Sequence, residues 1–160
     1  MKRGRRLTTE AQPWVARRAG VRREQERVRE AWKRGLFAIR SAGSGAGTSA
    51  YPKPDLIVFS QGGVVDIFQC KTTRRCRSHF SPSDWEDEVK TARRLRQLGF
   101  QVRVWLDFTL IRVGRGASIS RQFRIDGREG SSLAVTYYAR PGTIRWEWTE
   151  KAEPGGSRPK

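Results

Sequence analysis

The sequence contains a single histidine and two cysteines, and no apolar run reaches the roughly 18 residues that a membrane-spanning helix needs. One histidine, His79, excludes any mechanism that requires two. Cys70 and Cys76 lack CxxC spacing, which argues against a disulfide framework or a zinc site and favours free thiols in a reducing compartment. The basic N-terminus lacks the apolar stretch of a signal peptide. We therefore expect a cytoplasmic protein with no membrane partner, in a cell or in the cytoplasm of a virus's host.

Acidic residues are also few, because 16 aspartates and glutamates stand against 33 lysines and arginines, for a formal net charge of +17. Such an excess predicts a polyanionic partner. Arginine supplies 26 of the 33 basic residues, and its guanidinium group pairs with phosphate oxygens and stacks on bases, which favours a nucleic acid. A GC-rich genome is an alternative reason for abundant arginine, but it does not explain the imbalance of sign.

A length of 160 residues and an apolar fraction of 36% are typical of one domain with a core of its own. We expect a flexible basic arm over residues 1–19, one folded domain over 20–149 and a flexible tail over 150–160. Residues 74–80 are expected to form a basic loop. Helices are predicted at about 20–34 and 82–98, and strands at 36–42, 55–60, 64–73 and 101–108, with three more between 123 and 148. This order predicts an α/β fold in which helices flank one central mixed sheet, with extra C-terminal strands.

Two short segments carry local signals. Ser81, Pro82 and Asp84 form a helix start, and the acidic residues at 84–88 fit the helix dipole. The small-residue loop around Ser44 and Gly45 contains no Walker or dinucleotide motif, so no nucleotide cofactor is predicted.

Three polar residues are expected to meet at one end of the predicted hairpin. Gln69 and Lys71 are two apart on one strand and therefore share a face. A tight turn at 61–63 brings Asp55 within about one residue of position 70 in an antiparallel pair. Taken alone, such a trio is also compatible with a solvated surface patch.

Glu24 lies on the apolar face of the first predicted helix, where a carboxylate is costly to bury unless a positive group meets it. The alternative is that Glu24 lies at the edge of this apolar face and that its carboxylate reaches solvent. Together with Asp55, the amide oxygen of Gln69 and the carbonyl of Cys70, Glu24 would supply oxygen ligands for Mg²⁺. Lys71 would then orient or deprotonate a water and steady developing negative charge. This set of groups predicts phosphodiester hydrolysis.

Beyond this chemistry, Asp55 followed by Gln69-x-Lys71 resembles the PD-(D/E)xK motif of restriction-endonuclease-like nucleases. A longer pattern resembles the archaeal-type Holliday junction resolvases over about residues 20–108. It consists of Gly20-x-x-x-Glu24-x-Glu26, Gly35-x-Phe37-x-x-Arg40-Ser41-Ala42-Gly43-Ser44, Pro54-Asp55-Leu56, Gln69-Cys70-Lys71 and a helix over 82–98 that ends in Leu-Gly-Phe.

The resemblance implies a restriction-endonuclease-like fold and a homodimer that makes symmetric nicks in four-way DNA with Mg²⁺, for which Mn²⁺ would substitute. Family members usually carry Glu where this chain has Gln69, so we expect weaker metal affinity, with Glu24 and Asp55 supplying the negative charge. The catalytic residues that the resemblance implies are Glu24, Arg40, Asp55, Gln69 and Lys71.

Further residues are assigned by position. Phe80 and Trp85 fall where the family tends to place dimer contacts, although a role in the monomer core is an alternative. His79 is interpreted as a bystander in the basic loop. The residues expected to contact DNA are Arg22, Arg23, Arg40, Ser41, Ser44, Arg74, Arg75 and Arg77, and for the last three a merely solvated loop is the alternative.

Two rival functions stay open. The first keeps the fold and makes the chain a restriction- or repair-type nuclease acting on duplex or flapped DNA, which the Gln69-x-Lys71 pattern favours. The second is a catalytically inactive DNA-binding protein, with Gln69 as a sign of lost activity. The Arg40-Ser41-Ala42-Gly43-Ser44 segment favours junction resolution.

Overall fold

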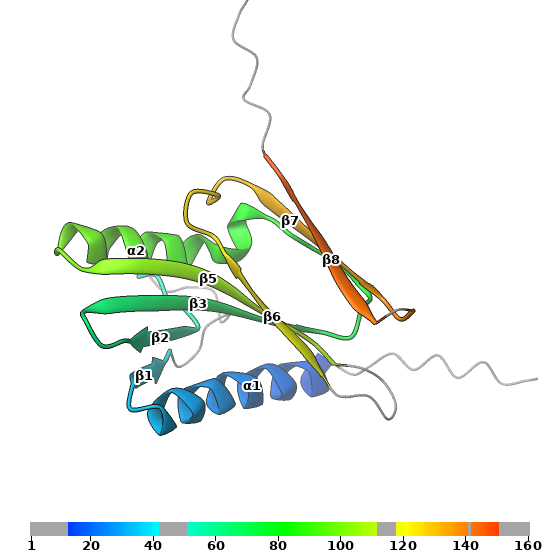
Figure 1. Cartoon of the computed structure of the whole chain (residues 1–160), viewed down its shortest axis with the longest axis horizontal. Helices are drawn as coiled ribbons and strands as arrows, with labels where there is room; N and C mark the ends of the chain where they lie inside the picture. The colour runs from blue at the N-terminus through cyan, green and yellow to red at the C-terminus, as the bar shows by residue number, and fades with distance from the viewer. Residues whose placement is uncertain (1–12, 42–50, 112–117, 141, 151–160) are drawn as a thin grey trace, which may run out of the picture.

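The computed structural model describes residues 13–41, 51–111, 118–140 and 142–150 (Figure 1). The first helix, α1, spans Pro13–Lys33 and so begins inside the segment that the sequence assigned to a flexible arm. That boundary was wrong because proline fits the first turn of a helix, where its missing N–H costs no hydrogen bond. Gly35 follows the helix with a φ of 72°, as expected for a glycine that ends it.

The central sheet has five strands in the order β1-β2-β3-β5-β6. All neighbours are antiparallel except β3 and β5, which pair in parallel through the crossover that contains α2 (Glu86–Gln97). The sheet is therefore mixed, as predicted. Its strands are β1 (Phe37–Arg40), β2 (Leu56–Phe59), β3 (Val64–Thr73), β5 (Gln101–Leu110) and β6 (Ile119–Arg124).

A second sheet of three strands, in the order β4-β7-β8, holds the C-terminal strands β7 (Ser132–Tyr138) and β8 (Thr143–Thr149). Two of the extra C-terminal strands that the sequence predicted thus lie with β4 in a sheet of their own. The predicted basic loop was wrong in its second half, because Arg77–Phe80 forms strand β4 and pairs with β7. The residues Arg, Ser and His of this strand give no apolar alternation, so the sequence alone does not predict it. The strand is recognised only from its pairing with β7.

The second helix follows a 3-10 turn over Pro82–Trp85 and spans Glu86–Gln97 as α2. The backbone N–H of Ser81 donates to Asp84 at 2.9 Å, which fixes the start of this segment in agreement with the predicted capping signal. Gly99, with a φ of 91°, follows its end.

The two faces of the central sheet carry different partners. Val65 and Ile67 face the main core with α2 and the second sheet, whereas Phe68 and Cys70 pack with α1. Figure 1 shows α1 and α2 on opposite sides of the sheet. In the described part of the chain, no helix is long and apolar enough to cross a membrane. The fold is thus α/β, and the alternation along β3 decides which polar side chains meet at its end.

Candidate active site

A pocket of about 520 Å³ lies where the middle of α1, the end of β1, the start of β2, the second half of β3, and the 3-10 turn with the start of α2 meet. The structure brings together all five side chains that the sequence singled out as catalytic. The pocket is lined by Gly20, Val21, Glu24, Arg40, Lys53, Asp55, Gln69, Cys70, Lys71, Ser83, Asp84, Glu86, Asp87 and Glu88.

Asp55 occupies the position just before β2 and is buried. Leu56 pairs with Phe68, so the hairpin register puts Asp55 opposite Gln69. The Gln69 amide and the Cys70 backbone N–H, the latter at 2.8 Å, both donate to Asp55 Oδ2. The N–H and C=O of one residue in a strand point the same way, so the Cys70 carbonyl also faces the Asp55 side.

Glu24 is buried on α1, with 8% of its surface exposed, so it does not reach solvent as the alternative interpretation had it. Its Oε2 accepts a hydrogen bond from Arg40 Nε, which supplies the positive partner that burial requires. Burial raises the pKa of Glu24, and the negative charge of Asp55 raises it further, while Arg40 opposes both. Glu24 and Asp55 are therefore two carboxylates that repel each other within one pocket.

Lys71 projects from β3 toward the 3-10 turn that precedes α2, and its Nζ lies 2.9 Å from Asp84 Oδ1. Burial alone would raise the pKa of Asp84, but the Ser81 N–H and the ammonium group of Lys71 outweigh burial and hold it below its usual value. Lys71 is thus held at the pocket by the same carboxylate that caps the helix.

Glu88 was missed by the sequence analysis, although it lines the same pocket. Only 1% of its surface is exposed, its Oε1 accepts the backbone N–H of Asp55 at 3.2 Å, and its Oε2 has no partner among the described residues. Burial raises its pKa to about 8. The available signal was its spacing, three residues after Trp85 and four before Ala92 on the apolar stripe of α2.

The donor set of the pocket fits a hard divalent cation. Glu24 and Asp55 offer carboxylate oxygens, Gln69 an amide oxygen if its side chain turns, and Cys70 a backbone carbonyl, which are the ligand types that Mg²⁺ prefers. Among the described residues, no group of three His, Cys, Asp or Glu side chains gathers closely enough to hold a metal. The neutral Gln69 stands where a third acid would complete such a group.

The thiol of Cys70 points to the other side of β3, toward α1, where it packs among buried residues. Burial and the carboxylates of Asp107, Asp55 and Glu24 raise its pKa well above the usual value. A buried, protonated thiol is a poor metal ligand, so only the backbone of Cys70 is a candidate donor.

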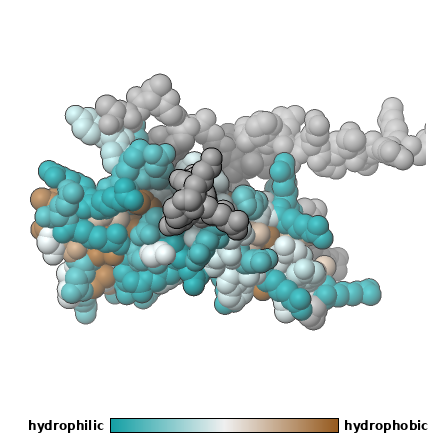
Figure 2. All heavy atoms as spheres, turned by 90° about the horizontal axis from the view of Figure 1, so that it is seen from above, coloured by the Kyte–Doolittle hydropathy of each residue, from teal (hydrophilic) through white to brown (hydrophobic). Residues whose placement is uncertain are grey.

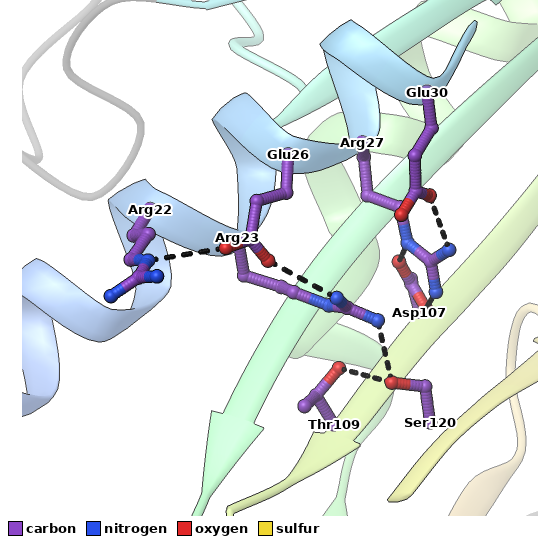
Figure 3. A network of polar contacts seen from close by, with 8 residues as sticks. All are labelled: Arg22, Arg23, Glu26, Arg27, Glu30, Asp107, Thr109 and Ser120. Carbon is purple, nitrogen blue, oxygen red and sulfur yellow. Dashed lines mark hydrogen bonds and ion pairs between the residues drawn. The ribbon is translucent and has the colours of Figure 1, made fainter. Parts of the chain in front are cut away.

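The predicted DNA contacts on α1 belong to a polar network along the helix (Figure 3). Glu26 accepts from Arg22 at 3.1 Å and from Arg23 at 3.2 Å, and Arg23 also donates to Ser120 at 2.7 Å. Arg22 has 82% of its side chain exposed and remains accessible to a phosphate, whereas Arg23 is largely engaged.

Of the other predicted contacts, Arg74 and Arg75 are exposed after β3, and Arg77 is exposed on β4; none forms an ion pair with a described residue. The backbone N–H of Ser41 donates to the Asp55 carbonyl at 3.2 Å, which ties the end of β1 to the pocket. Ser44 lies outside the described residues. His79 is not in a loop but on β4, and it does not line the pocket.

The predicted dimer contacts at Phe80 and Trp85 were wrong. Both side chains lie in the core of the monomer, with 7% and 0% of their surfaces exposed. Phe80 packs edge-on against Phe108, and Trp85 Nε1 donates to the Glu129 carbonyl at 3.1 Å. Phe80 belongs to the second sheet itself, and Trp85 contacts Trp148 of that sheet at 6.0 Å between ring centroids, a packing that was not predicted from the sequence.

The comparisons with known proteins identify one family. A family model described as archaeal Holliday junction resolvase (Hjc) matches residues 15–104. Among solved structures, the chain is similar to Archaeoglobus fulgidus Hjc, a Holliday junction resolvase from an archaeal hyperthermophile, at 28% identity and a TM-score of 0.46, covering 66% of this chain and 75% of that one. No curated protein matches the chain. The residues matched by the family model include the whole candidate site and exclude β6, β7 and β8.

Proposed function

Because the chain belongs to the archaeal Holliday junction resolvase family, we propose that it cleaves four-way DNA junctions by Mg²⁺-dependent hydrolysis and leaves paired, symmetric nicks. The observation that carries this proposal is the convergence of the five candidate catalytic residues on one pocket. They come from α1, β1, the start of β2 and β3, so no local sequence preference alone would gather them.

Mg²⁺ would be held by Glu24, Asp55, the amide oxygen of Gln69 and the carbonyl of Cys70, and Mn²⁺ would substitute. When bound, the ion polarises the phosphate and lowers the pKa of a water. The Gln69 amide group now donates to Asp55, so a rotation of this amide would present its oxygen instead. A cation would also offset the burial and the negative charge of Asp55, which together raise the pKa of Glu24.

Lys71 and Arg40 would act on the DNA itself. The Lys71 ammonium group, held 2.9 Å from Asp84, would orient the attacking water and steady negative charge on the phosphate. Arg40 would contact the scissile or adjacent phosphate with the guanidinium nitrogens that Glu24 does not bind. Ser41 follows Arg40, its backbone N–H donates to the Asp55 carbonyl, and its hydroxyl would add a phosphate contact.

Affinity for DNA would come from the excess of arginine. Figure 2 shows a face on which hydrophilic side chains cover most of the described surface. Arg22, Arg74, Arg75 and Arg77 are exposed and would contact phosphates beside the pocket. A net charge of +17 over 160 residues supports a large polyanion as the partner.

A homodimer would supply the two active sites that paired nicks in a two-fold symmetric junction require. Because Phe80 and Trp85 are buried, its interface would lie elsewhere. Trp32, Phe37 and Ile39 are 55%, 49% and 44% exposed at the end of α1 and on the edge strand β1, and exposed apolar side chains of this kind mark interfaces. Light scattering of the wild type and of a Trp32→Arg/Ile39→Arg variant tests this assignment. We expect a dimeric wild type and a monomeric variant, and a variant that is still dimeric would contradict the assignment.

Cleavage of labelled four-way, flapped and linear DNA, each with Mg²⁺ or EDTA, tests the proposed function. We expect Mg²⁺-dependent nicks at symmetric positions in the four-way junction, and none in a Lys71→Ala variant. Linear duplex or flaps cut as fast as the junction would favour a restriction- or repair-type nuclease. Tight junction binding without cutting in any divalent metal would favour an inactive DNA-binding protein, an outcome for which the neutral Gln69 is the specific reason.

A further inference from the structure

Arginine and tryptophan side chains gather around a second pocket, of about 310 Å³, where β6 of the central sheet meets β8 of the second sheet. Both are edge strands, and the whole pocket lies beyond residue 104, outside the residues matched by the family model. It is separate from the candidate active site, with which it shares no lining residue. The lining residues that matter are Arg121, Arg124, Asp126, Arg128, Trp146 and Trp148.

Two guanidinium groups in this pocket lie over tryptophan rings. The Arg121 Cζ is 4.1 Å from the Trp146 ring centroid, and the Arg128 Cζ is 5.2 Å from that of Trp148. Both distances are within the range of a cation–π contact. Such stacking holds each guanidinium group in one orientation while its N–H groups stay available for a further acceptor.

Contacts with other aromatic rings hold the two tryptophan rings in place. Trp146 contacts Phe123 at 5.6 Å between centroids, and Trp148 contacts the buried Trp85 at 6.0 Å, both edge to face. Trp146 nevertheless keeps 42% of its surface exposed. A rigid aromatic surface that is partly exposed at a pocket is suited to stacking by a flat ligand.

The pocket carries positive charge that the described residues do not neutralise. Its one acid, Asp126, accepts from Arg96 at 2.6 Å and from Arg124 at 3.0 Å, so it is already paired. Arg121 and Arg128 are exposed and form no ion pair with a described residue. An anionic ligand would therefore find two unpaired arginines beside two aromatic rings.

We propose that this pocket binds an unpaired nucleotide of a DNA strand, with its phosphate on Arg121 and Arg128 and its base against the tryptophan rings. Its volume lies at the lower end of the roughly 300–1,000 Å³ that small-molecule sites occupy, which suits one nucleotide. Arginines that follow the backbone and aromatic rings that stack on bases are the features of single-strand binding sites.

An acidic peptide would also be attracted by the arginines, but it would leave the exposed ring of Trp146 unused. A purely structural role, closing the seam between the two sheets, would need the rings but not two unpaired arginines. The inference rests on the proposed function, because a DNA junction that is opened at its centre or nicked is a source of unpaired nucleotides close to the protein.

The test is the affinity for a labelled single-stranded oligo(dT), measured by fluorescence anisotropy in EDTA, for the wild type and an Arg121→Gln/Arg128→Gln variant. Its matched control, Arg93→Gln/Arg94→Gln, removes two exposed arginines from α2. We expect about tenfold weaker binding in the pocket variant only, and a salt dependence reduced by about 1.4 in log–log slope, for two phosphate contacts at roughly 0.7 each. An equal loss in both variants would mean that net charge alone is responsible and would overturn the proposal.

Two further measurements separate stacking from charge. A Trp146→Leu variant, which keeps an apolar side chain on β8, is expected to weaken oligo(dT) binding but not the binding of an abasic strand of equal length. Abasic strand or polyglutamate bound as tightly as oligo(dT) by the wild type would contradict a nucleotide site. Junction cleavage by the arginine variant should persist; a wild type that cuts no junction would refute the proposed function whatever the oligo(dT) result.

Discussion

The Nζ of Lys71 and the Oδ1 of Asp84 lie 2.9 Å apart, joining strand β3 to the 3-10 turn that precedes α2. The other oxygen of the same carboxylate accepts the Ser81 N–H. Asp84 therefore caps the 3-10 turn and also holds Lys71 in place. A substitution of Asp84 can thus be tested for its effect on catalytic activity and, separately, on the free energy of unfolding.

An Asp84→Asn variant keeps an oxygen for Ser81 but loses the charge that holds Lys71. We expect kcat for junction cleavage to fall roughly tenfold or more, with little change in KM, because a misplaced catalytic group costs turnover. The free energy of unfolding should fall by no more than about 1 kcal/mol, since both side chains are about one-third exposed and screened by solvent. Glu30→Gln, which breaks an ion pair with Arg27 outside the candidate active-site pocket, is the matched control. Equal effects in both variants would contradict the positioning role.

A Gln69→Glu variant should bind divalent metal more tightly. The change would add a third carboxylate beside Asp55, to which the Gln69 amide now donates a hydrogen bond. Without metal the variant should be less stable, because the introduced carboxylate would repel those of Glu24 and Asp55, and Mn²⁺ should reverse that loss. Calorimetric titration with Mn²⁺ and thermal unfolding with and without the ion measure both effects. A variant that binds Mn²⁺ no better than the wild type would argue against a cation at this position.

Much of the site could be predicted because it depends on short-range rules. Gly62 and Gly63, with φ of 83° and 77°, allow the tight turn after β2, and that turn fixes the register that puts Asp55 opposite Gln69. Apolar alternation then decides that Gln69 and Lys71 share a face. The mixed sheet also followed from the order of the elements.

What could not be predicted depends on partners distant in sequence. Strand β4 has no apolar alternation of its own and exists through its pairing with β7. The burial of Trp85 depends on the second sheet, whose Trp148 contacts it at 6.0 Å between ring centroids. Glu88 looks like one acid in an acidic helix start, and only the tertiary fold shows that it accepts the backbone N–H of Asp55. Apolar alternation predicts which side chains share a face of a strand, but it does not predict which helix or sheet will pack on that face.

Removing Arg40 should destabilise the protein through Glu24. In an Arg40→Gln variant the buried carboxylate of Glu24 loses its hydrogen-bond donor while the charge of Asp55 remains, so its pKa should rise further. We expect a loss of about 1–3 kcal/mol in the free energy of unfolding at neutral pH, typical of a buried charge left without a partner. A Glu24→Gln/Arg40→Gln double variant should recover most of it. Urea unfolding of the three proteins decides the matter, and a double variant as unstable as the single one would contradict the pairing.

Glu88 should make the stability fall with rising pH. Burial raises its pKa from an ordinary 4.5 to about 8, so between these values the carboxyl group is neutral when folded and ionised when unfolded. The unfolded state therefore binds fewer protons, and the contribution of Glu88 is fully present below pH 4.5 and is lost as pH rises to about 8, by at most about 1.4 kcal/mol per pH unit. A Glu88→Gln variant keeps an acceptor for the Asp55 N–H but does not titrate. The free energy of unfolding of the variant minus that of the wild type, from urea denaturation at a series of pH values, should grow over this window and level off above it. A difference that stays constant from pH 5 to 8 would mean that Glu88 is ionised in the folded protein.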